Sequence, residues 1–396
     1  MAGIAALAIG YVLSQFYRSF MAVLTPILTI EIGMTKAELS VASGAWFAAF
    51  ALAQFAIGVS LDRWGPKRTA SILLGVCGGG GALLFSMAVE PWMVICAMAL
   101  IGLGCAPVLM SILVIFAHNY PPARFAVLAS WTIAFGTAGN VIGASPLANA
   151  AEAFGWRFVL VILAGFTVTT ALAVYALVRD PPRDHENTGS GFSGYAELMR
   201  LRVLWPIIPL TALNYAPATG IRGLWAGPYL SDVYGADVIL IGQVTFFMAL
   251  AMVAGSFLYG PMDVIFKTRK WVAVVGNTAS LLVLAYLAFV PVPGIFETTV
   301  ALVVIGVAGG SYALLMAHAR AFVPRHLTGR GVTLMNFFSI GGVGVMQFMT
   351  GGVVTASTTP DNPATAYTAL FLFYLVTLGF ALAVYLAARD AKPEQT

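Results

Sequence analysis

Two arginines lie deep inside long apolar segments of the sequence, where charged side chains are rare. Arg18 falls near the middle of the segment 4–30, and Arg222 falls within the segment 204–230. A guanidinium at such depth is costly unless it lines water or meets an anion. All sixteen Asp and Glu residues can be placed in loops, tails or segment ends, so none is left to pair with either arginine. Because a guanidinium matches carboxylate and phosphate geometry, the arginines predict a binding site for a small anionic substrate, most simply a carboxylate.

Helical spacing places polar and aromatic side chains on the same faces as the two arginines. Those on the first face are Tyr11, Ser14 and Thr25, those on the second are Thr211, Tyr215, Trp225 and Tyr229, and further amides are Asn140, Asn336, Gln243 and Gln347. We expect the substrate to contact Arg18, Arg222, Tyr11, Ser14, Tyr215, Trp225, Tyr229, Asn140 and Asn336. The alternatives are aromatic packing, interhelical hydrogen bonds of the amides, and arginines bound to water or backbone carbonyls.

The elements that must position these residues follow from composition. Of the 396 residues, 60% are hydrophobic and only 9% are charged, whereas soluble domains carry charges at about 25% of positions. This excludes a soluble globular protein and points to helices packed in a lipid bilayer. The net charge of +4 provides no basic stripe, so nucleic acid is not expected as a partner.

Apolar runs of about 20 residues predict an all-α integral membrane protein with twelve transmembrane helices. The expected spans are 4–30, 40–61, 69–89, 92–117, 125–149, 158–178, 204–230, 238–262, 271–290, 298–320, 331–355 and 365–388. One long polar connection, 179–202, divides them six and six. We therefore expect a six-helix bundle over 1–180, a cytoplasmic linker over 181–203, and a second six-helix bundle over 204–396.

The distribution of Lys and Arg predicts the orientation of the spans. With Met1 in the cytoplasm, 16 of the 20 basic residues fall in inner loops or the C-terminal tail, and only Lys36 and Arg157 fall outside. The positive-inside rule then places both termini in the cytoplasm and the protein in the cytoplasmic membrane.

An internal repeat supports the six-plus-six division. The sixth span ends in the sequence ALAVYALVRD, which closes at Asp180, and the twelfth ends in ALAVYLAARD, which closes at Asp390. Two bundles in the same orientation follow, and such parallel repeats typically hold a substrate between them near the middle of the bilayer.

The loop after the second span reads Gly58-Val-Ser-Leu-Asp62-Arg63-Trp-Gly65-Pro-Lys67-Arg68. It resembles the signature of the major facilitator superfamily between the second and third helices, and a looser copy in the second half contains Asp263 followed by Lys267, Arg269 and Lys270. The resemblance implies the two-bundle fold of this family and transport by rocking of the halves. The expected gating residues are Gly58, Asp62, Arg63, Gly65, Lys67, Arg68 and Asp263, with Asp62 in a charged latch; a solvated basic loop is the alternative.

Departures from two subgroups of this family narrow the expected function. Met98 stands where drug/proton antiporters carry an arginine, and the second and eighth spans lack the arginines of nitrate carriers. No intramembrane Asp, Glu or His suggests a proton relay, which favours exchange or uniport. The alternatives to an organic-anion carrier are an exporter of amphipathic compounds, a metal importer using Met248 and Met252, and a receptor without transport activity.

No nucleophile with a neighbouring base and no phosphate-binding loop is apparent, so the sequence does not predict an enzyme. Cys77, Cys96 and Cys105 lie in apolar runs without metal-ligand spacing and are interpreted as buried small side chains. The expected cofactor and metal content is none, the expected partners are a small-molecule substrate and the lipid bilayer, and we expect a monomer.

Overall fold

The computed structural model describes residues 2–120, 128, 131–180, 193–290, 292–324, 327–359 and 362–391, without the side chains of residues 62, 117, 193, 328 and 329. These residues are helical or lie in short connections, apart from one isolated β-bridge between Thr359 and Asn362. They form two compact units, Met1–Thr188 with Val238–Gln243, and Gly189–Asp237 with Val244–Thr396. Part of the expected linker 181–203 lies outside the described residues.

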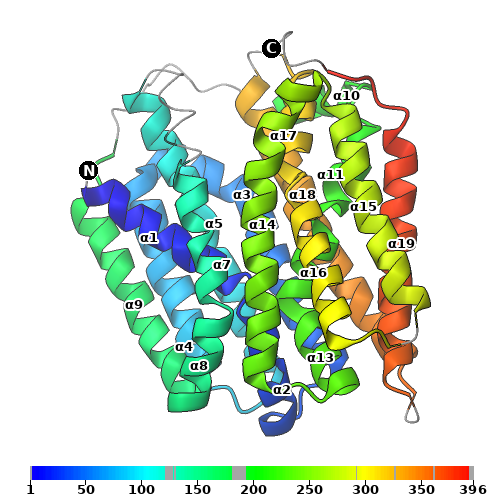
Figure 1. The fold of residues 1–396 in the computed structure, drawn as a ribbon. Coiled ribbons are helices and arrows are strands. Elements are labelled where there is room, and N and C mark those ends of the chain that lie inside the picture. The colour runs from blue at the N-terminus through cyan, green and yellow to red at the C-terminus, as the bar shows by residue number, and fades with distance from the viewer. Residues whose placement is uncertain are drawn as a thin grey trace. The chain divides into compact units, whose positions relative to one another are not determined.

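The first unit is a bundle of helices that pack closely side by side (Figure 1). Its elements are α1 (Ala2–Tyr17), α2 (Met21–Glu31), α3 (Lys36–Ile72), the π-helix η1 (Leu73–Gly79), α4 (Gly80–Ser86), α5 (Pro91–Asn119), α7 (Ala138–Ile142), α8 (Ser145–Phe154) and α9 (Trp156–Leu177). A capping box starts α3: the Thr35 hydroxyl accepts the backbone N–H of Glu38, whose carboxylate accepts the N–H of Thr35.

The second unit is built from a second set of helices. These are α10 (Ser193–Arg200), α11 (Ile207–Leu213), α12 (Tyr215–Gly220), the π-helix η2 (Ile221–Trp225), α13 (Ala226–Tyr234), α14 (Val238–Phe266), α15 (Lys270–Phe289), α16 (Ile295–Gly309), α17 (Tyr312–Arg320), α18 (Thr328–Ala356) and α19 (Ala364–Tyr385). Within this unit α15 packs against α16 and α19, and α11 packs against α18 and α19.

Within the described part of the chain, nine helices are long and apolar enough to cross a bilayer, or ten if the bent pair α1 and α2 forms one span. They correspond to ten of the twelve expected spans. The expected span 125–149 lies partly outside the described residues, and 204–230 is divided into the short helices between 207 and 234. Pro217 and Pro228 contribute to this division, because proline cannot donate a backbone hydrogen bond within a helix.

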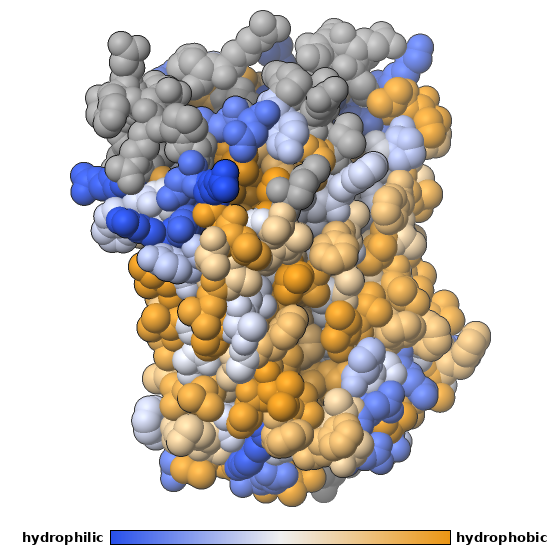
Figure 2. Space-filling view, turned by 90° about the vertical axis from the view of Figure 1, so that its left-hand side faces the viewer, coloured by the Kyte–Doolittle hydropathy of each residue, from blue (hydrophilic) through white to orange (hydrophobic). Residues whose placement is uncertain are grey.

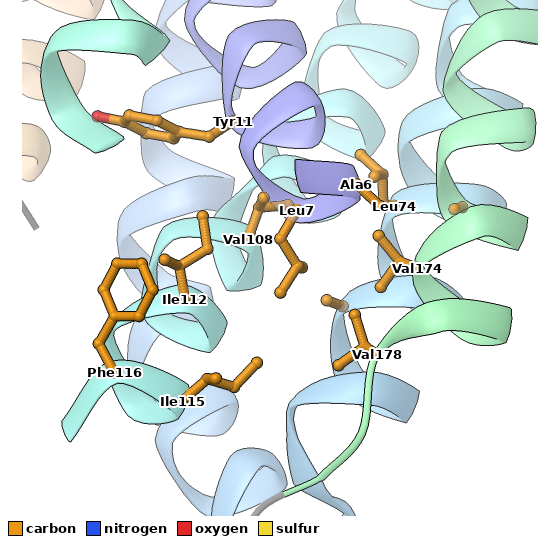
Figure 3. Close-up of a cluster of buried hydrophobic side chains, with 12 residues drawn as sticks. Ala6, Leu7, Tyr11, Leu74, Val108, Ile112, Ile115, Phe116, Val174 and Val178 are labelled. Atoms are coloured by element: carbon orange, nitrogen blue, oxygen red, sulfur yellow. The ribbon is translucent and has the colours of Figure 1, made fainter. Parts of the chain in front are cut away.

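The core of the first unit lies where α1, α5, α9 and η1 meet (Figure 3). Leu7 of α1, Leu74 of η1, Val108 of α5 and Val174 of α9 are fully buried there. Small residues let the helices approach: a Cβ at Gly102 of α5 would collide with the backbone carbonyl of Trp46 in α3. This contact fixes α3 against α5 next to the arginine-bearing end of α1.

Large apolar side chains are also exposed on the outside of the helices. On α9, Phe158, Ile162 and Phe166 recur every four residues and are 56%, 56% and 50% exposed. The face shown in Figure 2 is apolar through its middle and carries hydrophilic side chains near both ends. Such a band would be unfavourable in water and suits the hydrocarbon core of a bilayer.

Candidate functional site

Arg18 occupies a break in the first predicted span. Helix α1 ends at Tyr17 and α2 begins at Met21, and the two axes differ in direction by 51°. The hydroxyl of Ser19 donates to the carbonyls of Gln15 and Phe16, both at 3.3 Å, and so satisfies acceptors at the end of α1. The break therefore exposes part of a cationic residue at membrane depth without leaving these backbone acceptors unsatisfied.

The guanidinium of Arg18 lies over two aromatic rings of α3. Its Cζ is 5.3 Å from the ring centre of Trp46 and 5.6 Å from that of Phe50. These two rings are themselves stacked, with centres 5.1 Å apart and planes inclined by 18°. Cation–π contact stabilises the charge and orients the guanidinium, but it satisfies none of its N–H donors.

Within the described residues, no carboxylate pairs with Arg18, and its Nε has no hydrogen-bond partner. An arginine held by aromatic faces, with N–H groups still available, can bind an anion along its edge.

Arg222 is fully buried inside the π-helix η2 of the second unit. Its neighbours in the chain are bonded to α18: the Trp225 indole donates to the hydroxyl of Thr350 at 3.0 Å, and the Gln347 amide donates to the carbonyl of Gly220 at 3.4 Å. A Cβ at Gly220 would collide with the hydroxyl of Tyr374. The residues that flank Arg222 are thus bonded to α18 and packed against α19, and π-helical turns are frequent at functional sites.

The structure brings Tyr215 and Asn336 together through a residue that the sequence did not single out. The rings of Tyr215 and Tyr312 lie 5.2 Å apart, and the Tyr312 hydroxyl donates to Oδ1 of Asn336 at 2.8 Å. Tyr312 is the first residue of α17, directly after the interruption between α16 and α17. Helical periodicity in the sequence does not predict that it contacts Tyr215 and Asn336.

Tyr229 lies elsewhere in the second unit, in an aromatic cluster. Its ring contacts those of Tyr234, Tyr367 and Phe371, with centres between 5.1 and 5.6 Å apart. The contacts of Tyr229 are made to α13 and α19, and the Trp225 indole bonds to α18, all within the same unit. They favour a packing role for both residues.

The remaining predicted residues of the first unit are buried, and all but Asn140 lie close to Arg18 in sequence. The Tyr11 hydroxyl accepts a hydrogen bond from the amide of Gln15 at 2.6 Å, and its ring occupies the space that a side chain at position 136 would need. Ser14 is buried on the same helix, and Asn140 is buried in α7. Thr25 donates to the carbonyl of Ala22 on its own helix.

The predicted gating loop of the first unit turns at Gly65, whose φ is +83°. A Cβ there would lie 2.6 to 2.7 Å from the carboxylate of Asp180, and this carboxylate accepts the backbone N–H of Lys67 at 2.7 Å. Glycine is thus required both for the backbone conformation and for the approach of the carboxylate. Asp180 was recognised in the sequence only as part of the repeat, and its contact with the loop was missed.

The other residues of this loop are less constrained. Arg63 and Arg68 are exposed, and the ammonium of Lys67 lies 4.8 Å from the ring centre of Tyr175. No described atom lies within 4 Å of a Cβ built at Gly58. The side chain of Asp62 lies outside the described part of the structure, so the latch expected there stays a prediction.

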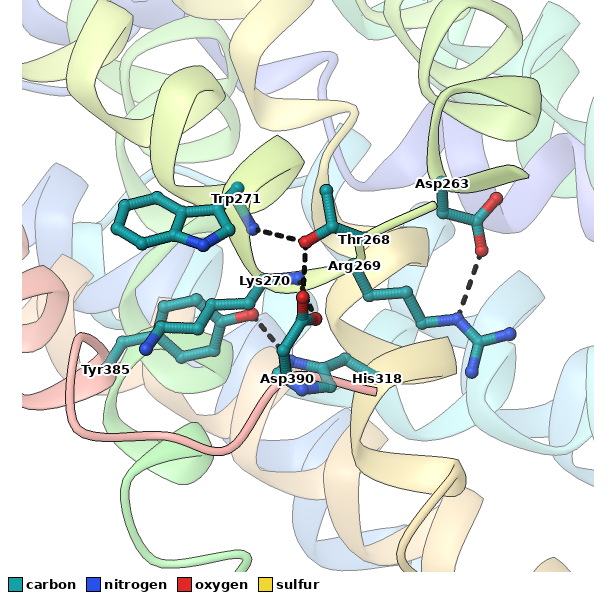
Figure 4. Close-up of polar contacts among 8 residues, drawn as sticks. All are labelled: Asp263, Thr268, Arg269, Lys270, Trp271, His318, Tyr385 and Asp390. Carbon is teal, nitrogen blue, oxygen red and sulfur yellow. Dashed lines mark hydrogen bonds and ion pairs between the residues drawn. The ribbon is translucent and has the colours of Figure 1, made fainter. Parts of the chain in front are cut away.

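The corresponding loop of the second unit is held by two carboxylates (Figure 4). Asp263 pairs with Arg269 at 3.0 Å, with both side chains largely buried. Asp390, the repeat counterpart of Asp180, accepts the backbone N–H of Lys270 at 2.9 Å and the hydroxyl of Thr268 at 2.5 Å. The last residue of each repeated sequence therefore binds the backbone at the start of the helix that follows the gating loop.

Asp390 is ionised where it binds this loop. Burial acts to raise the pKa of its carboxyl, but the hydrogen bonds from Thr268 and from the backbone of Lys270 outweigh burial and hold that pKa below its usual value. Beside it, Nε2 of His318 donates to the carbonyl of Arg389, because a carbonyl can only accept, so Nδ1 accepts the hydroxyl proton of Tyr385 in neutral histidine.

Comparison with known proteins identifies the family. The family model described as the Major Facilitator Superfamily matches residues 7–221, more than half of the chain. The chain belongs to the major facilitator superfamily. It is therefore a multi-pass membrane protein with the fold of these secondary transporters, as the loop signature and the predicted spans implied.

Several solved transporters of this superfamily share the fold. A bacterial homologue of the human lysosomal transporter Spinster, in an inward-facing and unoccupied conformation, is 19% identical, with 98% of this chain and 96% of that chain covered and a TM-score of 0.73. The nucleoside transporter NupG is 16% identical over 98% of this chain and 100% of its own, with a TM-score of 0.76.

One curated relative has a named substrate. The probable sulfoacetate transporter SauU of Cupriavidus necator is 22% identical over 303 residues, which cover 70% of each chain. Sulfoacetate, the substrate in its name, is a small organic anion.

Proposed function

We propose that this superfamily member transports a small organic anion, a carboxylate, across the cytoplasmic membrane by alternating access, through rocking of its two six-helix halves. Arg18 and Arg222 bind the negative charge of the substrate, one from each half. The observation that carries the proposal is the Arg18 guanidinium, which lies at membrane depth on an aromatic surface with no carboxylate partner among the described residues. The substrate named for the relative SauU supports the same class, because sulfoacetate is an anion that carries a carboxylate.

Exchange or uniport fits this site better than proton symport. Among the described carboxylates of the second unit, Asp263 and Asp390 are engaged at its gating loop, where they bind Arg269 and the backbone of Lys270. A substrate anion that enters with its own charge can neutralise the arginines without a protein-bound proton.

Uptake by purified protein in liposomes tests the function. We expect vesicles loaded with unlabelled anion to accumulate the same radiolabelled anion in counterflow, with sulfoacetate, malonate and acetate as the first probes. Protein-free vesicles set the background, and a neutral nucleoside and an amphipathic dye represent the alternative substrates. Accumulation of the dye but of none of the anions would replace this proposal by the amphipathic-exporter alternative.

The orientation proposed for the chain has its own test. Because inner loops hold 16 of the 20 basic residues, we place both termini and the loop 179–202 in the cytoplasm and Lys36 outside. In a variant lacking the three native cysteines, a cysteine at position 36 should react with an impermeant maleimide in intact cells, and one at position 188 only after lysis. Labelling of position 188 in intact cells contradicts the orientation.

A further inference from the structure

Trp46 carries a hydrogen-bond donor for which the described structure provides no acceptor. Its side chain is fully buried, and within the described residues its indole Nε1 has no hydrogen-bond partner. Most buried polar groups in proteins are hydrogen-bonded, and those that are not require an explanation. The other buried indole donors behave normally: Trp156 donates to Glu31, and Trp225 donates to Thr350.

The surroundings of Trp46 leave its indole little freedom to find another acceptor. Phe47 packs edge-on at 4.9 Å and Phe50 stacks at 5.1 Å between ring centres. The backbone of Trp46 is held by Gly102 of α5, where a Cβ would collide with it. The indole is therefore a rigid group whose N–H has a fixed direction.

Arg18 is the polar residue stacked on this indole, and it too has an unsatisfied donor. Its guanidinium lies 5.3 Å from the Trp46 ring centre, and its Nε has no partner within the described part of the chain. Because the N–H groups of a guanidinium lie in its plane, an acceptor binds at its edge, which stacking on the rings leaves uncovered. Two unsatisfied donors on stacked neighbouring side chains are the arrangement that two oxygens of one anionic group would satisfy, with N–H···O distances of about 2.9 Å.

We propose that Trp46 is a further substrate-binding residue, whose indole N–H donates to the same anionic group that Arg18 binds. The site in the first half then selects an oxyanion with at least two oxygens on one centre, such as a carboxylate or a sulfonate. The inference rests on the proposed anion transport and adds a neutral donor to it. A rigid neutral donor contributes direction without adding charge, which discriminates against spherical anions such as chloride.

The substitution Trp46→Phe removes the donor and keeps an aromatic surface under Arg18. We expect the affinity for whichever of sulfoacetate, malonate and acetate binds most tightly to fall about tenfold, the usual effect of losing one hydrogen bond to a charged group. Chloride competition should be unaffected. The melting temperature without ligand should fall by no more than the lost packing of the smaller ring accounts for, because the variant also buries one unsatisfied donor fewer.

Calorimetry and thermal melting in detergent measure both quantities. Trp92→Phe, at an exposed tryptophan of α5, is the matched control and should bind the anion normally. If the smaller phenylalanine prevents folding, β-(3-benzothienyl)alanine incorporated at position 46 keeps both rings and removes only the N–H.

The outcomes separate this inference from the function on which it rests. Normal anion affinity in Trp46→Phe together with loss of affinity in Arg18→Ala overturns the role of Trp46 and leaves the anion site standing. Normal affinity in both variants removes the anion site itself. A lower melting temperature of the ligand-free benzothienylalanine variant, which keeps both rings, shows that the indole already has a structural acceptor, which also overturns the proposal.

Discussion

Arg18→Ala should abolish measurable binding of the anionic substrate while leaving the protein folded. The guanidinium lies on Trp46 and Phe50 and has no carboxylate partner among the described residues, so its removal leaves no buried charge behind. It does remove the charge that compensates the substrate in a medium of low dielectric constant. A neutral analogue of the substrate should bind as weakly as before or slightly better.

Arg18→Lys separates charge from geometry at the same position. Lysine keeps the positive charge but loses the planar fork and its stacking on the aromatic rings, so we expect a loss of about 1–3 kcal/mol in anion affinity. Titration calorimetry after a folding check by thermal melting provides both values. Arg222→Lys should lower the anion affinity by a similar amount.

Arg157 provides a matched control for the arginine substitutions. Its guanidinium also lies over a tryptophan, Trp156, with 4.2 Å between Cζ and the ring centre, and it lies 3.7 Å from the Glu31 carboxylate. Arg157→Ala should lower stability slightly and leave anion affinity intact. If Arg157→Ala weakens anion binding as much as Arg18→Ala does, the effect is one of general charge and the assigned site is wrong.

Gly65→Ala should slow transport at least tenfold with little change in substrate affinity. With φ +83° and ψ 165°, position 65 lies in a backbone region essentially restricted to glycine, which costs another residue about 1–3 kcal/mol, and the added methyl would meet the Asp180 carboxylate at 2.6 to 2.7 Å. The carboxylate must then give up its bond to the Lys67 backbone, and the gating loop is distorted. The proposed anion site is not part of this loop, so we expect the rate to change more than the affinity. Separate measurements of turnover and equilibrium affinity in proteoliposomes test this.

Two further variants isolate the cause of the Gly65 effect. Gly165→Ala on α9 adds the same methyl where no described atom lies within 4 Å, and it should leave both turnover and stability unchanged or slightly improved. In an Asp180→Ala background, the effect of Gly65→Ala should shrink, because the collision is gone and only the backbone strain is left. Equal effects of Gly65→Ala with and without Asp180 would show that the contact is irrelevant to gating.

Much of the fold follows from the sequence because a bilayer imposes long apolar helices. Ten of the expected spans have counterparts in the described helices, within the uncertainty of helix ends. The break at Arg18 and the π-helix at Arg222 were not predicted. Hydropathy averages over about twenty residues, so it cannot detect an interruption of three residues or a single extra residue within a turn.

Residues of the proposed site could be singled out from the sequence where one residue type alone carried the signal. An arginine at membrane depth stands out in any apolar segment, and Arg18 and Arg222 were found in that way. Trp46 and Tyr312 were missed because their importance lies in contacts between helices far apart in sequence. Asp180 and Asp390 could be recognised in the sequence only as the last residues of the internal repeat. Their contacts could not be predicted, because they bind backbone N–H groups, which every residue type except proline carries.

The π-helix around Arg222 also constrains how this segment can change in length. A π-helical turn accommodates one residue more than the α-helical turn it replaces, and each residue of an α-helix advances about 100° around the axis. Deleting one residue within Ile221–Trp225 can therefore be absorbed by reversion to an α-helix, with the phase of α13 and its contacts to α19 preserved. The same deletion in the uniform helix α19 would rotate every later side chain off its partner. Loss and gain of single residues should thus accumulate at the arginine-bearing turn, where they would reorient the cation without dismantling the helix around it.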